Sequence, residues 1–335
     1  MNQATAGRLK AVVVAALLCW APFGAQGDAV ELVQEGMLMG AYGSTVGPGG
    51  DLFVAEAATG SIARVNPRTG EVTPYADGLP VSPLFAVIGL GGVTDVAFIG
   101  STAYALVTLV GPPFVAGSAV DGIYRYDGNG WTPIADLGTF SLNNPPVPAF
   151  FVPTGVQFAL EAFQGRFLVA DGHHNRVLQV TLDGQVSEFL AFGNIVPTGL
   201  AVTGETVYMA EAGPVPHLPV DGRIVAFGPR SPVVTEVASG SPLLVDVEFG
   251  RGRTLFGLSQ GEFVPGNPEG SPALPDTGAL VRVERDGTFA VVEDGLNLPV
   301  SMEVIQNDAY VVTLTGGILR IDDIAAAPHG YATGR

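Results

Sequence analysis

The chain has 335 residues and a formal net charge of −17, with 32 acidic residues against 15 basic ones. A surface this acidic repels nucleic acid and anionic membranes, so neither is expected as a partner. Its single cysteine, Cys19, and its single lysine, Lys10, both lie near the N-terminus. Without that segment the chain has no cysteine nucleophile, no Schiff-base lysine and no disulfide framework.

Residues 1–27 have the pattern of a signal peptide. Arg8 and Lys10 precede the apolar run Ala11–Trp20, and small residues follow at Ala25 to Gly27. The apolar run is shorter than the roughly 20 residues that a membrane-spanning helix needs. We therefore expect cleavage near Asp28 and export to the periplasm or the extracellular space. No membrane insertion is expected after cleavage.

The chain from residue 28 to 324 repeats a unit of four short strands joined by turns. The third unit shows it best, with strands expected at Val156–Leu160, Arg166–Ala170, Arg176–Thr181 and Gln185–Leu190. Asp183-Gly184 between the last two is a typical hairpin turn. Similar units are expected at about 42–79, 92–137, 196–240, 244–296 and 301–323. Four strands per repeat and about 50 residues between repeats indicate the blades of a β-propeller.

The sixth unit lacks a fourth strand, and the N-terminus offers a replacement. The sequence VELVQEGM at Val30–Met37 matches FAVVEDGL at Phe289–Leu296, which is the fourth strand of the fifth unit. An N-terminal strand in the last blade would close the ring and remove its exposed edges. We therefore predict an all-β, six-bladed propeller with four antiparallel strands per blade, a loose tail at 325–335, and a monomeric state.

Short motifs give this chain a family resemblance. Leu168 to Asp171 followed by Asn175-Arg176-Val177 resembles the signature of NHL-type six-bladed propellers. The whole chain is similar to the ScyD/ScyE family in the order of its motifs. These are VTPYADGLP, ADLGTFSLNNP, the pair PTGV and PTGL, and the pair FVAEA and YMAEA. The resemblance implies an exported bacterial propeller; the namesakes of the family belong to gene clusters for an aromatic indole–phenol pigment.

Acidic residues at equivalent repeat positions predict a metal site. The equivalent first-strand positions are taken as Gly43, Asp95, Gly155, Gly199, Asp246 and Ser301. Blades two and five lie opposite in a six-fold ring, so Asp95 and Asp246 should face one another at the channel mouth, and Asp171 and Glu211 end second strands on the same face. Oxygen ligands without cysteine suit Ca²⁺ or another hard divalent cation. The alternatives are turn chemistry with Asn175 for Asp171 and a repeated AEA motif for Glu211.

The same face should hold a ligand. Long loops at 79–91, 110–120, 142–151, 213–220 and 261–277 fall there and carry phenylalanines among prolines and glycines. Apolar loops above an acidic funnel suit a small aromatic or apolar molecule, although the loops could equally pack on one another. The residues predicted to contact this ligand are Glu56, His173, Ser259, Phe114, Phe151 and Phe263.

The sequence is compatible with two functions. The first is a non-catalytic module that binds a small aromatic or apolar ligand, or a protein partner, at the acidic mouth. The second is a metal-supported hydrolase, similar to a lactonase, acting on such a molecule at the same face. No catalytic residue is assigned and no organic cofactor is implied, because no convincing pair of nucleophile and base is visible. The fold alone does not decide between them.

Overall fold

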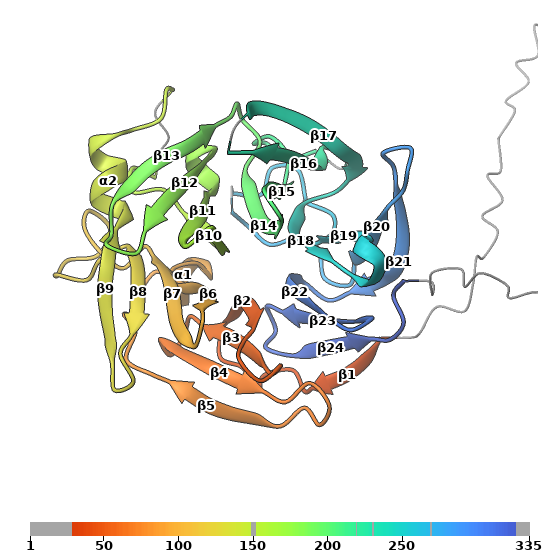
Figure 1. Cartoon of the computed structure of the whole chain (residues 1–335), viewed down its shortest axis with the longest axis horizontal. Coiled ribbons are helices and arrows are strands. Elements are labelled where there is room, and N and C mark those ends of the chain that lie inside the picture. The colour runs from red at the N-terminus through yellow and green to blue at the C-terminus, as the bar shows by residue number, and fades with distance from the viewer. Residues whose placement is uncertain (1–28, 149–151, 219, 230, 269, 326–335) are drawn as a thin grey trace, which may run out of the picture.

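A computed structural model describes residues 29–148, 152–218, 220–229, 231–268 and 270–325. These residues form six four-stranded antiparallel sheets arranged around a central axis (Figure 1). The six-bladed β-propeller is therefore confirmed. The predicted signal peptide, Phe151 and residues 326–335 of the predicted tail lie outside the described residues. Ala325 is buried and hydrogen-bonded to Asn307, so it belongs to the propeller.

The first three blades follow chain order from the innermost strand outward. Blade 1 contains β2 (Ala41–Val46), β3 (Leu52–Glu56), β4 (Ser61–Val65) and β5 (Val72–Ala76). Blade 2 contains β6 (Gly92–Ile99), β7 (Thr102–Thr108), β8 (Gly122–Tyr126) and β9 (Trp131–Asp136). Blade 3 contains β10 (Gln157–Phe163), β11 (Arg166–Asp171), β12 (Arg176–Thr181) and β13 (Val186–Ala191).

The other three blades repeat this order, except that the last blade ends with the first strand of the chain. Blade 4 contains β14 (Pro197–Thr203), β15 (Thr206–Glu211), β16 (Gly222–Gly228) and β17 (Ser231–Ser241). Blade 5 contains β18 (Leu244–Phe249), β19 (Leu255–Ser259), β20 (Gly278–Val283) and β21 (Phe289–Leu296). Blade 6 contains β22 (Pro299–Ile305), β23 (Asp308–Thr313), β24 (Ile318–Ile321) and β1 (Val30–Val33).

The predicted closure by the N-terminal strand is confirmed. β1 pairs antiparallel with β24, with Val30 opposite Arg320 and Val33 opposite Ile318. Val33 and Ile318 are buried in the apolar cluster that joins blade 6 to blade 1. The pairing covers the open edge of β24 and locks the two ends of the ring together.

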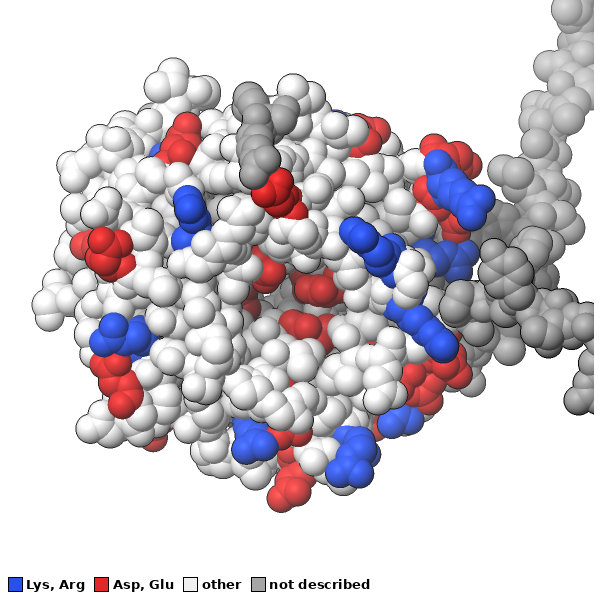
Figure 2. All heavy atoms as spheres, in the orientation of Figure 1, with Lys and Arg blue, Asp and Glu red and all other residues white. Residues whose placement is uncertain are grey.

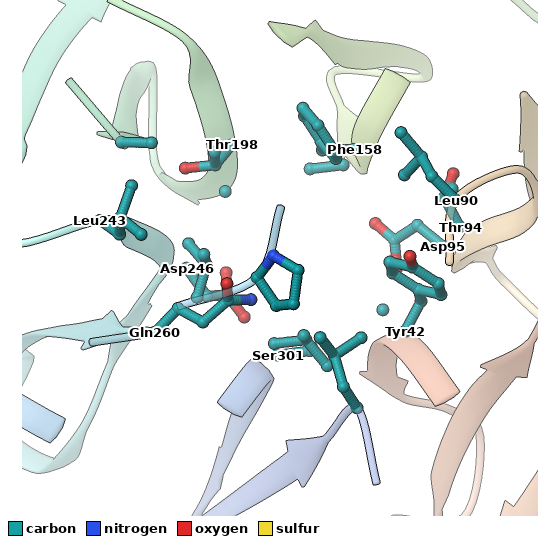
Figure 3. Close-up of a pocket in the computed structure, with 18 of the residues that line it drawn as sticks. Tyr42, Leu90, Thr94, Asp95, Phe158, Thr198, Leu243, Asp246, Gln260 and Ser301 are labelled. Carbon is teal, nitrogen blue, oxygen red and sulfur yellow. The ribbon is translucent and has the colours of Figure 1, made fainter. Parts of the chain in front are cut away.

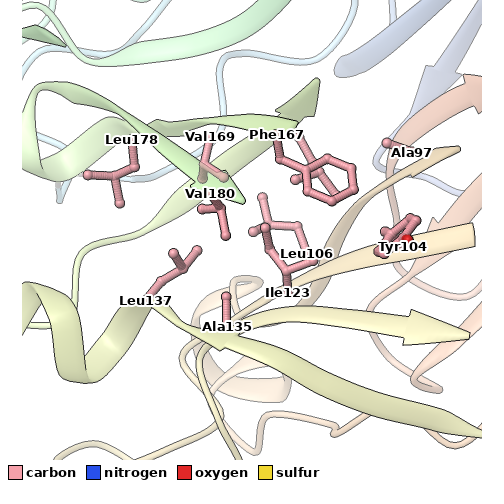
Figure 4. Packing of buried hydrophobic residues seen from close by; sticks show 11 residues of the cluster. Ala97, Tyr104, Leu106, Ile123, Ala135, Leu137, Phe167, Val169, Leu178 and Val180 are labelled. Atoms are coloured by element: carbon pink, nitrogen blue, oxygen red, sulfur yellow. The ribbon is translucent and has the colours of Figure 1, made fainter. Parts of the chain in front are cut away.

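Neighbouring blades pack face to face, which explains why the strands are apolar on both sides. In β11, Phe167 and Val169 pack against blade 2, whereas Leu168 and Ala170 face blade 4. Successive side chains of a strand point to opposite faces of its sheet, so a strand buried on both sides needs an unbroken apolar run. Figure 4 shows the cluster between blades 2 and 3, where the rings of Tyr104 and Phe167 lie 4.7 Å apart.

The two faces of the propeller carry different connections. Strands alternate in direction, so the links from second to third strands and from one blade to the next emerge together on what we call the loop face. It holds α1 (Phe85–Ile88), α2 (Leu137–Asn143) and η1 (Gly172–His174). The short hairpins and η2 (Arg251–Arg253) lie on the opposite, hairpin face, which is turned toward the viewer in Figures 1 and 2. Among the described residues, none of the helices is long and apolar enough to cross a membrane.

The register of blade 3 corrects one predicted repeat position. Irregular pairing near the start of each innermost strand places Asp95 opposite Leu106, Asp246 opposite Leu258 and Ser301 opposite Val312. In blade 3 the residue at this level is Ala159, which pairs with Ala170. The prediction of Gly155 was therefore wrong, because the PTGV motif precedes β10 whereas PTGL lies inside β14.

Candidate functional site

A cavity of about 470 Å³ opens on the loop face, where the innermost strands converge (Figure 3). Its walls are largely apolar and include Phe85, Ile88, Leu90, Phe158, Leu200 and Leu243. Polar groups lie between them and at the bottom of the cavity. This volume and this mixture of wall groups are typical of small-molecule sites.

Asp95 and Asp246, here called the aspartate pair, lie on opposite sides of this cavity, as the repeat predicted (Figure 3). Their oxygens are engaged by backbone amides. Asp95 accepts hydrogen bonds from Val96 at 2.8 Å and from Leu160 of the next blade at 2.7 Å. Asp246 accepts from Val247 at 2.9 Å and from Met302 of the next blade at 2.8 Å. Each aspartate thus ties two blades together.

The glycines of this repeat position make room for the aspartates. A Cβ on Gly43 would collide with the Asp95 carboxylate, and a Cβ on Gly199 would lie 2.6 Å from Asp246 Oδ1. Neither glycine has a positive φ, so close approach rather than backbone conformation requires them. Ser301 makes a similar link between blades 6 and 1, since its hydroxyl accepts from Ser44 N at 3.1 Å.

A second acidic level lies two residues further along three innermost strands. Glu161, Glu248 and Glu303, here called the glutamate triad, line the lower part of the cavity. Residues i and i+2 of a strand point to the same side, so both levels face the central axis. From the hairpin face, Figure 2 shows acidic side chains around the central opening.

These carboxyl groups interact with one another. Burial, followed by the charge of Asp246, raises the pKa of Glu161 to about 8. Burial raises the pKa of Asp246 to about 7, against the effect of its backbone hydrogen bonds. Burial first, and neighbouring acids second, hold the pKa values of Glu248 and Glu303 well above their usual range. Burial likewise raises the pKa of Asp95. Part of this set is therefore protonated at neutral pH.

Two imidazoles line the wall formed by the loops of blades 3 and 4. Burial lowers the pKa of His173 to about 4 and also lowers the pKa of His217, so both rings are neutral at neutral pH. A neutral imidazole offers one donor and one acceptor. His173 lies 6.1 Å from the ring of Phe158, and His217 lies 5.3 Å from the ring of Phe263. Of the described residues that were predicted to contact a ligand, His173 is the one that lines this cavity.

Asp171, a predicted metal ligand, is buried inside blade 3 and does not line the cavity. Its Oδ2 forms an ion pair with Arg176 Nε at 2.9 Å and lies 3.3 Å from His174 Nδ1. Gln157 donates to its Oδ1 at 2.9 Å. The family-like signature is thus a structural network that anchors a second strand to a third. The neighbouring Asn175 accepts from the amides of Ile195 and Val196, which lie in the connection between blades 3 and 4 and not in the turn of Asn175 itself.

Glu211 and Glu56 also lie at the loop-face ends of second strands, outside the cavity lining. Burial raises the pKa of Glu211 to about 7, although Arg223 Nε lies 3.5 Å away and opposes this. Glu56 accepts from Met39 N at 2.8 Å and from the Ser61 hydroxyl at 3.1 Å. Both carboxylates therefore have local partners instead of an exposed ligand surface.

The remaining predicted ligand residues that the structure describes do not meet in the cavity. The Ser259 hydroxyl is buried and donates to the carbonyl of Pro242 at 2.5 Å. Phe114 is exposed on its loop. Phe263 supports His217 from behind the wall, within a cluster that includes Val196 and Ala212. Phe151 lies outside the described residues.

The predicted calcium site does not fit this arrangement. The described part of the chain holds no group of three or more His, Cys, Asp or Glu side chains placed to bind one metal ion. The aspartate pair already accepts backbone hydrogen bonds, whereas Asp171 and Glu211 point elsewhere. A Ca²⁺ ion takes six to eight oxygens, carbonyls and waters included, and the carboxylates of these four residues do not converge on one point.

Several cavity residues were missed at the sequence level. Glu248 and Glu303 could have been found from the strand period, because they stand two residues beyond Asp246 and Ser301. Glu161 stands two residues beyond Ala159, so it was hidden when Gly155 was taken as the repeat position. Phe158 was hidden by the register error in blade 3. Tyr42 gave no sequence signal, and its place in the wall comes from tertiary packing against Phe85 at 6.3 Å.

No protein-family model and no curated protein matches this chain. Solved structures do match its fold. The PQQ-bound aldose sugar dehydrogenase of Streptomyces coelicolor is 15% identical over 89% of this chain and 99% of its own, with a TM-score of 0.59. A gluconolactonase of Xanthomonas campestris is 13% identical over 89% and 90%, with a TM-score of 0.59. Virginiamycin B lyase of Staphylococcus aureus is 14% identical over 88% and 99%, with a TM-score of 0.55. These similarities show the fold, and one fold serves unrelated activities.

Proposed function

We propose that this protein binds a small, largely apolar or aromatic molecule in the loop-face cavity, without catalysing its conversion. The observation that carries the proposal is the lining of the cavity. Aromatic and aliphatic side chains form its walls, and neutral imidazoles and hydroxyls offer a few hydrogen bonds. Such a site buries an apolar ligand and orients it by a small number of polar contacts.

The charge of the lining narrows the class of ligand. Among the described residues, five carboxyl groups and no arginine or lysine line the cavity. A cavity with one sign of charge and low-dielectric walls concentrates ligands of opposite charge and repels those of like charge. The ligand is therefore neutral or carries an amine, and it is not a carboxylate, a sulfonate or a phosphate.

A matched pair of dyes tests this proposal. N-phenyl-1-naphthylamine and 8-anilinonaphthalene-1-sulfonate share a ring skeleton, but only the second carries a sulfonate. We expect saturable fluorescence enhancement with the neutral dye and binding weaker by about tenfold or more with the anionic dye. Leu90→Trp, which narrows the cavity, should weaken binding of the neutral dye.

The control for this experiment is Leu182→Trp, an exposed position on the hairpin face. It should leave dye binding unchanged. The proposed site would be contradicted if the neutral dye did not bind, or if it bound equally well to Leu90→Trp and Leu182→Trp. Stronger binding of the anionic dye would contradict the proposed charge selectivity.

The hydrolase alternative has less support. A gluconolactonase is among the proteins of the same fold, but the predicted metal ligands do not gather around one point. The alternative of a protein partner would involve the rim of the cavity and not its interior.

The narrower predictions from the sequence also stand as proposals, namely membership of the ScyD/ScyE family, removal of residues 1–27, export and a monomeric state. N-terminal sequencing of the protein from cell fractions would test processing and export together.

A further inference from the structure

Four long segments on the loop face contain no charged residue. They are residues 78–91, 109–120, 137–148 with 152–156, and 212–218 with 220, and none contains Asp, Glu, Lys or Arg. At the overall charged fraction of 14%, about one residue in seven would be charged. The segments precede or belong to blades 2, 3 and 4, so the uncharged surface extends around one side of the cavity mouth.

The loop face also holds most of the exposed large apolar side chains, and half of them, eight of sixteen, lie in the uncharged segments. Of the sixteen such side chains among the described residues, eleven lie in connections on the loop face. They are Met37, Met39, Val81, Val87, Ile88, Phe114, Leu142, Val147, Leu218, Val220 and Leu274. Val87 is 78% exposed and Val147 is 98% exposed, so these side chains are not turned inward to cover one another. Isolated exposed apolar residues are normal, but their concentration on one face indicates a binding surface.

The hairpin face provides the contrast. Arginine and acidic side chains are spread over it (Figure 2), as in the pairs Arg64–Asp51, Arg125–Asp127 and Arg320–Asp322. No arginine or lysine lies in any connection of the loop face. The loop face therefore lacks the cations that attract anionic lipid headgroups. Such headgroups also repel the acidic chain as a whole. The net negative charge of the protein is therefore compatible with binding to an uncharged lipid surface, but not to an anionic one.

The shape of the surface favours lipid over a protein partner. The exposed apolar side chains stand on separate loops around the cavity mouth, instead of forming one groove for a strand or helix. A lipid surface adapts to all of them at once. The cavity opens among the same loops, since Phe85, Ile88, Val215 and Pro272 line it. A rigid partner seated there would close the cavity, whereas a lipid surface is a phase in which an apolar ligand dissolves.

We propose that the loop face docks on a neutral, zwitterionic lipid surface, with the cavity mouth turned toward the lipid. Val87, Phe114 and their neighbours enter the headgroup region, and the charged hairpin face stays in water. Docking itself does not depend on the proposed ligand. Direct passage of an apolar ligand between the lipid and the cavity rests, in addition, on the proposed function.

Vesicle flotation with the ligand-free protein tests the docking. Phosphatidylcholine vesicles should carry the protein upward, and vesicles containing phosphatidylglycerol should carry less of it. The double variant Val87→Asp/Phe114→Asp should bind phosphatidylcholine about tenfold more weakly, because two apolar contacts are replaced by charges. Both side chains are exposed and neither lines the cavity, so dye binding in the absence of vesicles should be unchanged.

A matched double variant on the rest of the surface is the control. Leu182→Asp/Val291→Asp changes two side chains that are 42% and 39% exposed, outside the loop face, and should float like the unchanged protein. No flotation of the unchanged protein, or equal loss in both double variants, would overturn the docking. A dimer in solution that only Val87→Asp/Phe114→Asp dissociates would also overturn it, because the face would then join two copies. Loss of dye binding with intact flotation would overturn the proposed function alone.

Discussion

The two acidic levels of the central channel use the same kind of side chain for different purposes. The aspartate pair has short side chains whose oxygens accept amide hydrogens from two neighbouring blades. The glutamate triad stands two residues further along. Glu248 accepts an amide hydrogen from Phe249 of its own strand at 3.2 Å, so this bond does not join two blades. Burial, together with the charges of neighbouring acids that include Asp246, raises the pKa values of all three glutamates. The first level therefore stabilises the ring of blades. The second stores electrostatic repulsion that is relieved by protonation or by a bound amine.

This difference shows why a carboxylate in a channel is weak evidence for a ligand site. Side-chain length and the position of the next blade decide whether an oxygen meets a backbone amide. An aspartate at the first level reaches the amide of the next blade, as Asp95 reaches Leu160 at 2.7 Å. The following predictions test whether the two levels differ in this way.

The largest effect is expected from removing one aspartate. Asp246→Ala leaves the amides of Val247 and Met302 without their acceptor, which should lower the free energy of unfolding by about 2 kcal/mol. Glu248→Gln, two residues along the same strand, removes a repelled charge and should leave that free energy unchanged or higher. Urea unfolding at pH 7 measures both. Equal losses in the two variants would show that the levels are not distinct.

A smaller effect is expected from pH. A carboxyl group whose pKa is raised by folding binds more protons in the folded chain than in the unfolded chain. Its stabilising effect is therefore complete below about pH 4 and is lost as pH rises through the folded pKa. The relevant pKa values are about 7 for Asp246 and about 8 for Glu161, with Glu248 and Glu303 also raised. The melting temperature should therefore fall between pH 6.5 and 8.5. This window lies above the titration of His173, whose lowered pKa acts in the opposite direction.

The triple variant Glu161→Gln/Glu248→Gln/Glu303→Gln is the control for that pH dependence. Its melting temperature should fall less across the same window, with a remaining decline from Glu211 and the aspartate pair. A melting temperature that rises from pH 6.5 to 8.5, or a triple variant with an unchanged slope, would refute the assignment of the pH dependence to the triad.

The smallest effect is expected from divalent cations. Because the donors do not gather around one point, melts in EDTA and in millimolar Ca²⁺, Mg²⁺ or Zn²⁺ should coincide. A cation that binds only the folded chain at 100 times its dissociation constant would stabilise it by about 2.7 kcal/mol, which a melt would detect. A cation-specific rise that disappears in Asp95→Asn/Asp246→Asn would restore the metal-supported hydrolase as the leading proposal.

The repeat pattern was sufficient to predict the blades because each blade needs apolar strands of period two and turn residues at regular intervals. It also predicted that Asp95 and Asp246 would lie opposite, which follows from the number of blades alone. It failed in blade 3, where the near-duplicate motifs PTGV and PTGL have different positions relative to their strands. A motif can keep its sequence while a longer connection moves it out of the strand.

The sequence by itself determined the six blades, the closure by β1 and the uncharged character of the loop-face segments, because these depend on local pattern and composition. Only the tertiary structure decided which polar groups have partners. Asp171 is neutralised by Arg176 within its own blade, and Glu211 lies beside Arg223. Asp95 is held by an amide sixty-five residues away. A hydrogen bond between two blades forms only if the donor–acceptor distance is right to within a few tenths of an ångström. The spacing of repeats along the chain does not specify distances between blades so closely.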